Sequence, residues 1–167
     1  MERKSMSEKI YSDDPIVPYK STKINSSYSR MEIDAVLAKW GIKKSTWNWE
    51  PEINRIYIEF QYEELIEGVR VSPWIRVEAP VIWDSKTRNR AEAVHWNISL
   101  RVMYWFIKSH LEGAYLWQSN KTTAFLPYIA IGKELHQTLA KKMLRDIEKM
   151  PALEGSVQVN KEKIVDV

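Results

Sequence analysis

The sequence contains no cysteine among its 167 residues. A disulfide framework, a thiolate metal site and a cysteine nucleophile are therefore all excluded. Apolar runs are short as well, and none reaches the length of about 18 residues that a membrane-spanning helix needs. The first fifteen residues, MERKSMSEKIYSDDP, carry charges where a signal peptide would be apolar. We expect a cytoplasmic protein that has no contact with a membrane.

Glycine is scarce, with five residues, and the sequence has no Walker A, GxGxxG or GxSxG motif to form a phosphate loop or a nucleophile elbow. The histidines, His95, His110 and His136, are too scattered for a zinc site, so we expect no metal and no cofactor. The acidic pairs Asp13-Asp14 and Glu63-Glu64 are not followed by the Asp and Glu-x-Lys pattern of a two-metal nuclease. Nothing in the sequence identifies an enzyme, although an activity without a known motif stays open.

The chain is instead rich in tryptophan and tyrosine, with eight of each against three phenylalanines. Both side chains combine a large apolar body with a polar group, so they suit core packing and stacking surfaces alike. With 44% hydrophobic and 28% charged residues, the composition is that of a single folded domain. The net charge of +3 is unevenly spread: residues 86–110 hold five cations and one acidic residue, whereas residues 50–67 hold six glutamates and one arginine. We expect a basic pole and an acidic pole.

Hydrophobic periodicity predicts three helices. Residues 26–41 have an amphipathic pattern, with a hydroxyl N-cap from Ser27 or Ser29 and Gly41 just after the last helical residue. Residues 86–118 read as one long helix that is apolar on most sides and therefore central. Residues 133–150 show a third amphipathic pattern, which Pro151 ends.

Three strands are predicted between the first two helices, at residues 45–49, 55–62 and 68–77. The second strand alternates most clearly, because every other side chain from Ile56 to Tyr62 is apolar. Pro73 cannot donate a hydrogen bond to a neighbouring strand, which places it at a sheet edge or a bulge. The short connections predict antiparallel pairing.

Together these elements predict an α+β fold, in which a small antiparallel sheet of about three strands packs on the long central helix. Helices near both ends of the chain flank this core. We expect residues 1–25 to form an extended or partly disordered arm, residues 26–150 a single domain, and residues 151–167 a polar tail.

The candidate site lies on the sheet face that is turned away from the long helix. That face is predicted to be basic and aromatic, with Arg55, Tyr57, Arg70, Trp74 and Arg76, and with Trp47 or Trp49 beside them. Aromatic rings stack on bases of any sequence and guanidinium groups bind phosphates, so this pattern favours single-stranded nucleic acid as the ligand. The alternative is that the N-terminal arm or a partner covers this face.

A second basic line is predicted along one face of the long helix, at Arg90, Asn97, Arg101, Tyr104 and Lys108. The intervals of three, four and seven residues keep these side chains on one face. This line is either the ordinary solvated face of a helix or a groove whose cations Arg90, Arg101 and Lys108 contact phosphates.

Four short motifs come in an order that resembles a known family: YKSTKI at residues 19–24, LAKWG at 37–41, RAEAVHW at 90–96 and FLPY at 125–128. In this order they resemble a family of small uncharacterised proteins carried by phages, prophages and some archaeal mobile elements. The chain departs from that pattern where Val94-His95-Trp96 stands in place of a Val-Ala-Trp-Arg run. The family has no known activity, so the resemblance implies a viral or mobile-element setting in which small proteins often handle DNA.

Two functions from different classes therefore remain. The first is sequence-independent binding of single-stranded DNA through aromatic stacking and basic residues. The second is a structural or interaction protein, a homodimer or a host-factor binder, with Trp105 and Trp117 as anchors. Phosphate contacts weaken steeply with salt and an apolar interface does not, so salt dependence separates the two.

Overall fold

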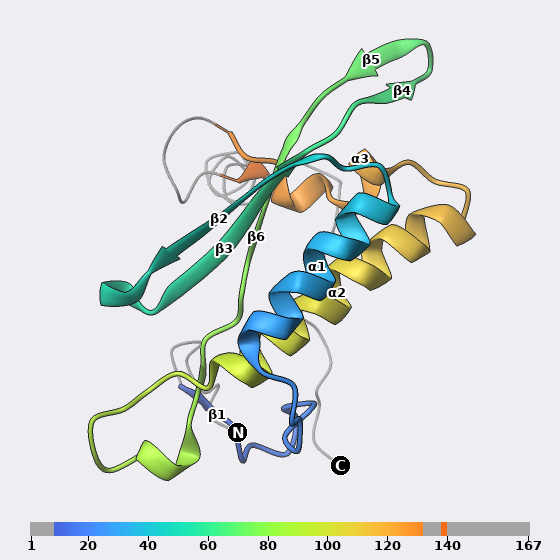
Figure 1. Ribbon diagram of the computed structural model, residues 1–167. Coiled ribbons are helices and arrows are strands. Elements are labelled where there is room, and N and C mark those ends of the chain that lie inside the picture. The colour runs from blue at the N-terminus through green and yellow to red at the C-terminus, as the bar shows by residue number, and fades with distance from the viewer. Residues whose placement is uncertain (1–8, 132–137, 140–167) are drawn as a thin grey trace, which may run out of the picture.

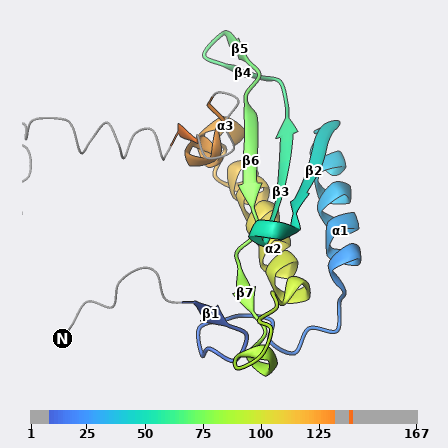
Figure 2. The same cartoon turned by 90° about the vertical axis from the view of Figure 1, so that its left-hand side faces the viewer.

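The computed structural model describes residues 9–131 and 138–139, and it confirms the α+β fold (Figure 1). A three-stranded antiparallel sheet of order β2-β3-β6 forms one layer. It consists of β2 (Lys44–Glu50), β3 (Arg55–Gln61) and β6 (Trp74–Glu78). Two helices, α1 (Ser26–Lys39) and α2 (Trp96–Leu116), form the second layer on one face of this sheet (Figures 1 and 2). Short 3-10 turns lie at Pro51–Ile53 (η1) and Leu126–Tyr128 (η3).

The core lies between the sheet and α2. Alternate residues of β3 and β6 point into it, as the period of two in the sequence predicts. These side chains pack against the apolar face of α2 and the buried residues of α1. The fully buried members of this core are Ile33, Leu37, Ile58, Phe60, Ile75, Leu100, Met103, Ile107, Leu111 and Phe125.

Helices α1 and α2 lie side by side and run in the same direction. At their N-terminal ends, the backbone N–H of Ser26 donates to Oδ1 of Asn97 at 2.9 Å. At their C-terminal ends, the rings of Trp40 and Tyr115 meet edge to face with centroids 5.7 Å apart. Among the helices of the described residues, none is long and apolar enough to cross a membrane.

The long helix is ten residues shorter than predicted at its N-terminal end. Residues 84–94 form a loop that contains a 3-10 turn, Ser85–Thr87 (η2). Local side chains stabilise this loop, because Asp84 accepts from the N–H of Lys86 and Thr87 accepts from the N–H of Ala93. Such side-chain hydrogen bonds compete with helix formation, so periodicity alone placed the start of the helix wrongly.

The predicted strand at 68–77 is two strands, separated at Ser72 and Pro73. Its first part, β5 (Val69–Val71), pairs with β4 (Glu64–Ile66), a strand that lies in the connection between the predicted strands 55–62 and 68–77. Glu67 and Gly68 connect them with φ of 48° and 82°, as in the primed two-residue turns that suit hairpins. This β4–β5 hairpin projects beyond the three-stranded sheet (Figure 1).

The described part of the N-terminal arm, from residue 9 onward, packs on the rest of the protein. Strand β1 (Ile10–Tyr11) pairs in parallel with β7 (Ile82–Trp83), and Val17 is buried in a small cluster with Ile82 and Ile98. The hydroxyl of Tyr11 donates to Glu92 at 2.6 Å. The helix predicted at 133–150 and the tail at 151–167 lie outside the continuous described range.

Gly41 ends α1 as predicted, although Asn25 and not a serine caps its start. Gly41 has φ of 75°, and the N–H groups of Gly41 and Ile42 donate to the carbonyls of Ala38 and Leu37. This is a Schellman cap, whose left-handed residue is normally glycine because a Cβ is strained there.

We predict that Gly41→Ala lowers the free energy of unfolding by about 1–2 kcal/mol in chemical denaturation.

The matched control is Gly113→Ala in α2. Gly113 has an ordinary helical φ and open space where a Cβ would lie. Gly113→Ala should therefore raise the free energy of unfolding by about 0.5–1 kcal/mol, because alanine favours a helix more than glycine does. If the two substitutions change the free energy of unfolding equally, the left-handed backbone conformation of Gly41 is not the cause of its effect.

Glu64 attaches the β4–β5 hairpin to the short helix α3 (Lys121–Ala124). Its carboxylate accepts from the N–H groups of Lys121 and Thr122 at 2.9 and 3.0 Å, and from the Thr122 hydroxyl at 2.9 Å. Burial raises the pKa of Glu64, but these hydrogen bonds and the Lys121 ammonium outweigh burial and hold the pKa below its ordinary value. The ionised form is therefore the one that the fold stabilises.

We predict that Glu64→Gln lowers the free energy of unfolding by about 1–2 kcal/mol at neutral pH. Because the folded pKa is lowered, this contribution is complete above the ordinary glutamate pKa and is lost as the pH falls through the folded value. The variant and the parent protein should therefore converge in stability only at a pH below the lowered pKa of folded Glu64. Glu63→Gln, at an exposed neighbour, should change stability by less than about 0.5 kcal/mol at any pH.

Candidate functional site

The sheet face that was predicted to bind nucleic acid is buried at its centre. Arg55, Tyr57 and Arg76 have exposed fractions of 6, 6 and 8%. Arg55 donates two hydrogen bonds to Glu78, at 2.7 and 2.8 Å, and Arg76 donates to Glu59 at 2.7 Å. The two positive charges are thus paired across strands, and the ring of Tyr57 lies about 6 Å from both guanidinium groups. The expectation of an open, positively charged stacking face is wrong for these three residues.

Trp47 and Trp49 lie on the opposite face of the sheet from Tyr57. Trp47 is opposite Ile58 and Trp49 is opposite Ile56, so both point to the helix layer. The indole N–H of Trp47 donates to Asp34 of α1 at 3.0 Å, and the Trp49 ring lies 6.3 Å from that of Trp96. Neither is beside the predicted site, because the antiparallel register places both tryptophans on the core face of the sheet.

The remaining predicted residues are dispersed. Trp74 is partly exposed on the sheet face with Arg76, whereas Arg70 lies on the β4–β5 hairpin with Glu63 at 3.7 Å. Arg90 is exposed in the loop of residues 84–94 and not on α2. The structure therefore does not bring the ten predicted residues into one surface.

The polar line along α2 is the contact with α1. Asn97 accepts from the first residue of α1, and Arg101 forms an ion pair with Glu32 of α1. Arg101 and Tyr104 are both buried. Most of this line is therefore an interface between two helices, and neither a solvated face nor an open groove.

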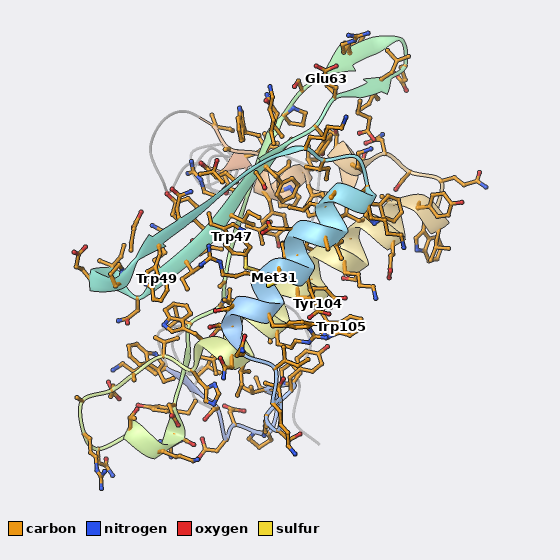
Figure 3. The ribbon with its side chains drawn as sticks, viewed as in Figure 1. Met31, Trp47, Trp49, Glu63, Tyr104 and Trp105 are labelled. Atoms are coloured by element: carbon orange, nitrogen blue, oxygen red, sulfur yellow. The ribbon has the colours of Figure 1, made fainter. Side chains whose placement is uncertain are left out.

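One accessible aromatic surface borders this helix interface. The ring of Tyr19 stacks on that of Trp105 with centroids 6.3 Å apart and planes inclined by 15°. Their exposed fractions are 40 and 37%. We call this pair the Tyr19–Trp105 platform. Figure 3 shows Tyr104 and Trp105 on one side of α1, whereas Trp47 and Trp49 lie on the other.

Cations surround the platform. The ammonium of Lys108 lies 4.7 Å from the centre of the Trp105 ring, and the guanidinium of Arg101 lies 5.6 Å from it. Lys108 is also 3.7 Å from Glu112, one turn along α2. Lys20 and Lys23 follow Tyr19 in the chain and are exposed. Of the predicted cations, Lys108 and Arg101 are thus the two that lie beside an accessible aromatic ring.

Tyr19 is held in an unusual backbone conformation. Its φ is 60°, in the left-handed region that aromatic residues rarely adopt. Its carbonyl accepts from the N–H of Thr22 at 2.9 Å, which closes a tight turn before α1. Such strained residues concentrate at binding sites, where the surrounding structure maintains them. No local pattern in the sequence points to this role of Tyr19, because its partner Trp105 lies on a helix far along the chain.

No group of three or more His, Asp or Glu that could hold a metal ion occurs within the described ranges. Comparison of the chain with family models, with curated proteins and with solved structures gives no match. The resemblance to mobile-element proteins therefore stays a prediction from the motifs.

Proposed function

We propose that the protein binds single-stranded nucleic acid, without sequence preference, through the Tyr19–Trp105 platform. The observation that carries the proposal is the pair of partly exposed, nearly parallel rings, with the Lys108 ammonium over the Trp105 ring. A base can extend such a stack irrespective of its identity, because every base has a π-face. The site differs from the one expected on the sheet, but the chemistry is the same.

The charges near the platform suit a phosphate backbone. Lys108 lies against Trp105, so a base stacked on the ring would place its own phosphate near the ammonium. Lys20 and Lys23 extend the positive charge along the turn that carries Tyr19. Arg101 is paired with Glu32 and is better suited to position Trp105 than to bind a phosphate directly.

The test is a titration with labelled oligo-dT, measured by fluorescence anisotropy at low and moderate salt. We expect Trp105→Ala to weaken binding by about 5- to 150-fold, since stacking on one base contributes about 1–3 kcal/mol. Lys108→Ala should lower the slope of log affinity against log salt by about 0.7 for each phosphate contact that is lost. Double-stranded DNA and RNA of equal length show which nucleic acid is preferred.

Trp74→Ala is the matched control, because Trp74 is 39% exposed but lies on the other side of the sheet. It should leave the affinity unchanged. If Trp74→Ala weakens binding and Trp105→Ala does not, the site lies on the sheet. If no nucleic acid binds at low salt, the function itself is refuted.

A second candidate function is a homo-oligomer or a host-factor binder, as the abundance of aromatic residues also suggests. The observation that favours it is the C-terminal end of α2, where Tyr115, Leu116 and Trp117 are consecutive and strongly exposed, Trp117 at 84%. Aromatic residues of this kind are common anchors of protein interfaces. Trp105, the other anchor expected from the sequence, belongs to the platform.

For self-association through this surface, light scattering should show a dimer whose fraction rises with concentration and is insensitive to salt. Trp117→Ala should abolish this dimer, whereas Trp105→Ala should not. A chain that is monomeric at every concentration, with and without Trp117, would contradict self-association.

A further inference from the structure

Strand β2 is an edge strand whose outer hydrogen-bonding groups can be assigned. The carbonyl of Ile56 accepts from Ala79 on the β6 side of β3 at 2.9 Å. Backbone groups alternate in direction along an antiparallel strand, so Arg55 and Tyr57 point instead to β2. Their partners there are Glu50 and Asn48. The intervening residues of β2, Ser45, Trp47 and Trp49, therefore direct their N–H and C=O groups away from the sheet.

No strand in the described part of the chain pairs with this outer edge. The sheet order is β2-β3-β6, and the pairs of β2 are all with β3. Edge strands are normally short or protected by bulges, prolines or inward charges. β2 has seven residues that pair with β3 without interruption, and no proline. Among the residues that the structure describes, this edge is therefore open to a further strand.

Helix α1 forms a wall beside this edge. The Trp47 side chain reaches α1, where its N–H donates to Asp34 and the Arg30 guanidinium lies 4.8 Å from its ring. Met31 is exposed on the same helix, and Trp49 is exposed on β2. Figures 2 and 3 show β2 as the strand next to α1, with Met31 on α1 and Trp47 and Trp49 on the strand. A strand edge beside a helix is the arrangement that domains use for peptide recognition by strand addition.

The geometry points to a second binding function: β2 and α1 hold an extended peptide of another protein as a fourth, antiparallel strand of the sheet. This function is independent of the nucleic-acid site, since the platform lies on the opposite side of α1. The outward groups of Ser45, Trp47 and Trp49 supply the backbone hydrogen bonds. The exposed ring of Trp49 and the side chain of Met31 supply apolar contacts.

The charges of β2 define the chemistry of this peptide. Lys43 and Lys44 lie at the start of the strand, and Glu50 and Glu52 lie at its end. An antiparallel peptide begins opposite Glu50 and ends opposite Lys44. It therefore pairs best when a basic residue stands near its N-terminal end and an acidic residue follows six positions later, because opposite charges across strands attract.

A second copy of β2 has this charge pattern but does not fit. A two-fold axis at the strand edge would place both copies of α1 on the same side of the joined sheet. Trp47 of β2 contacts α1, and Figure 2 shows α1 next to β2, so the two copies of α1 would lie close together at the two-fold axis. Packed helices need 8–10 Å between their axes. The occupant is therefore a peptide strand without such a helix.

The test uses two labelled peptides and fluorescence anisotropy with the full chain. The first peptide, KSTVNVE, has the favoured charge pattern, and the second, ESTVNVK, has the reverse pattern with the same composition. We expect the first to bind about three- to thirtyfold more tightly, since two charge pairs change sign. The double variant Lys44→Glu with Glu50→Lys should invert this preference.

Ser45→Pro removes an N–H that points outward and leaves the β2–β3 hydrogen bonds in place. It should weaken binding of the first peptide at least tenfold, whereas Ser45→Ala should not. Amide exchange gives a readout that needs no variant: the N–H groups of Ser45, Trp47 and Trp49 should exchange quickly in the free protein and slowly with the peptide. The N–H groups of Thr46 and Asn48 should be protected in both states.

Three results would overturn the inference. The first is that neither peptide binds at millimolar concentration. The second is that Ser45→Pro binds the first peptide as tightly as the parent protein does, while the N–H groups of Ser45, Trp47 and Trp49 in the parent protein stay unprotected by the peptide. The third is a dimer of the chain, seen by light scattering, that Ser45→Pro abolishes, since a second copy would then occupy the edge.

Discussion

The ion pair between Arg101 and Glu32 is the interaction on which the arrangement of the helix layer depends. Arg101 lies in the second turn of α2 and is almost fully buried, so its charge requires a partner. Glu32 supplies that partner only if α1 lies directly alongside α2. The pair thereby holds α1 alongside α2, and it also fixes the rings of Tyr104 and Trp105, which lie 4.4 and 5.6 Å from the guanidinium. Both proposed binding surfaces, one on each side of α1, follow from this position.

Sequence periodicity predicted the elements whose residues repeat regularly. The alternation of Ile56, Ile58 and Phe60 gave β3 and its core face, and Gly41 gave the end of α1. Predictions failed where local interactions override the pattern. The side chains of Asp84 and Thr87 stabilise a loop in a segment whose composition is helical. The positive φ of Glu67 and Gly68 forms a tight turn that makes residues 64–71 a separate hairpin.

The candidate site was the hardest part to predict. Arg55 and Arg76 were correctly placed with Tyr57 on one sheet face, but Glu59 and Glu78 alternate onto the same face. That alternation was a signal in the sequence that the arginines would be neutralised across strands. The stacking of Tyr19 on Trp105 had no such signal, since it joins an irregular turn to a helix far along the chain. Long-range contacts between irregular and regular segments have no period to detect.

The parallel direction of α1 and α2 has a consequence for how the chain folds. Neighbouring helices that run the same way cannot be joined by a short turn, so the connection from Trp40 to His95 carries the strands β2 to β7. The contact between the helices therefore closes a loop that contains the whole sheet. Closing long loops costs chain entropy before the contacts compensate for it, and proteins dominated by such contacts fold slowly. The last native contact to form is thus expected to be the helix interface on which both surfaces depend.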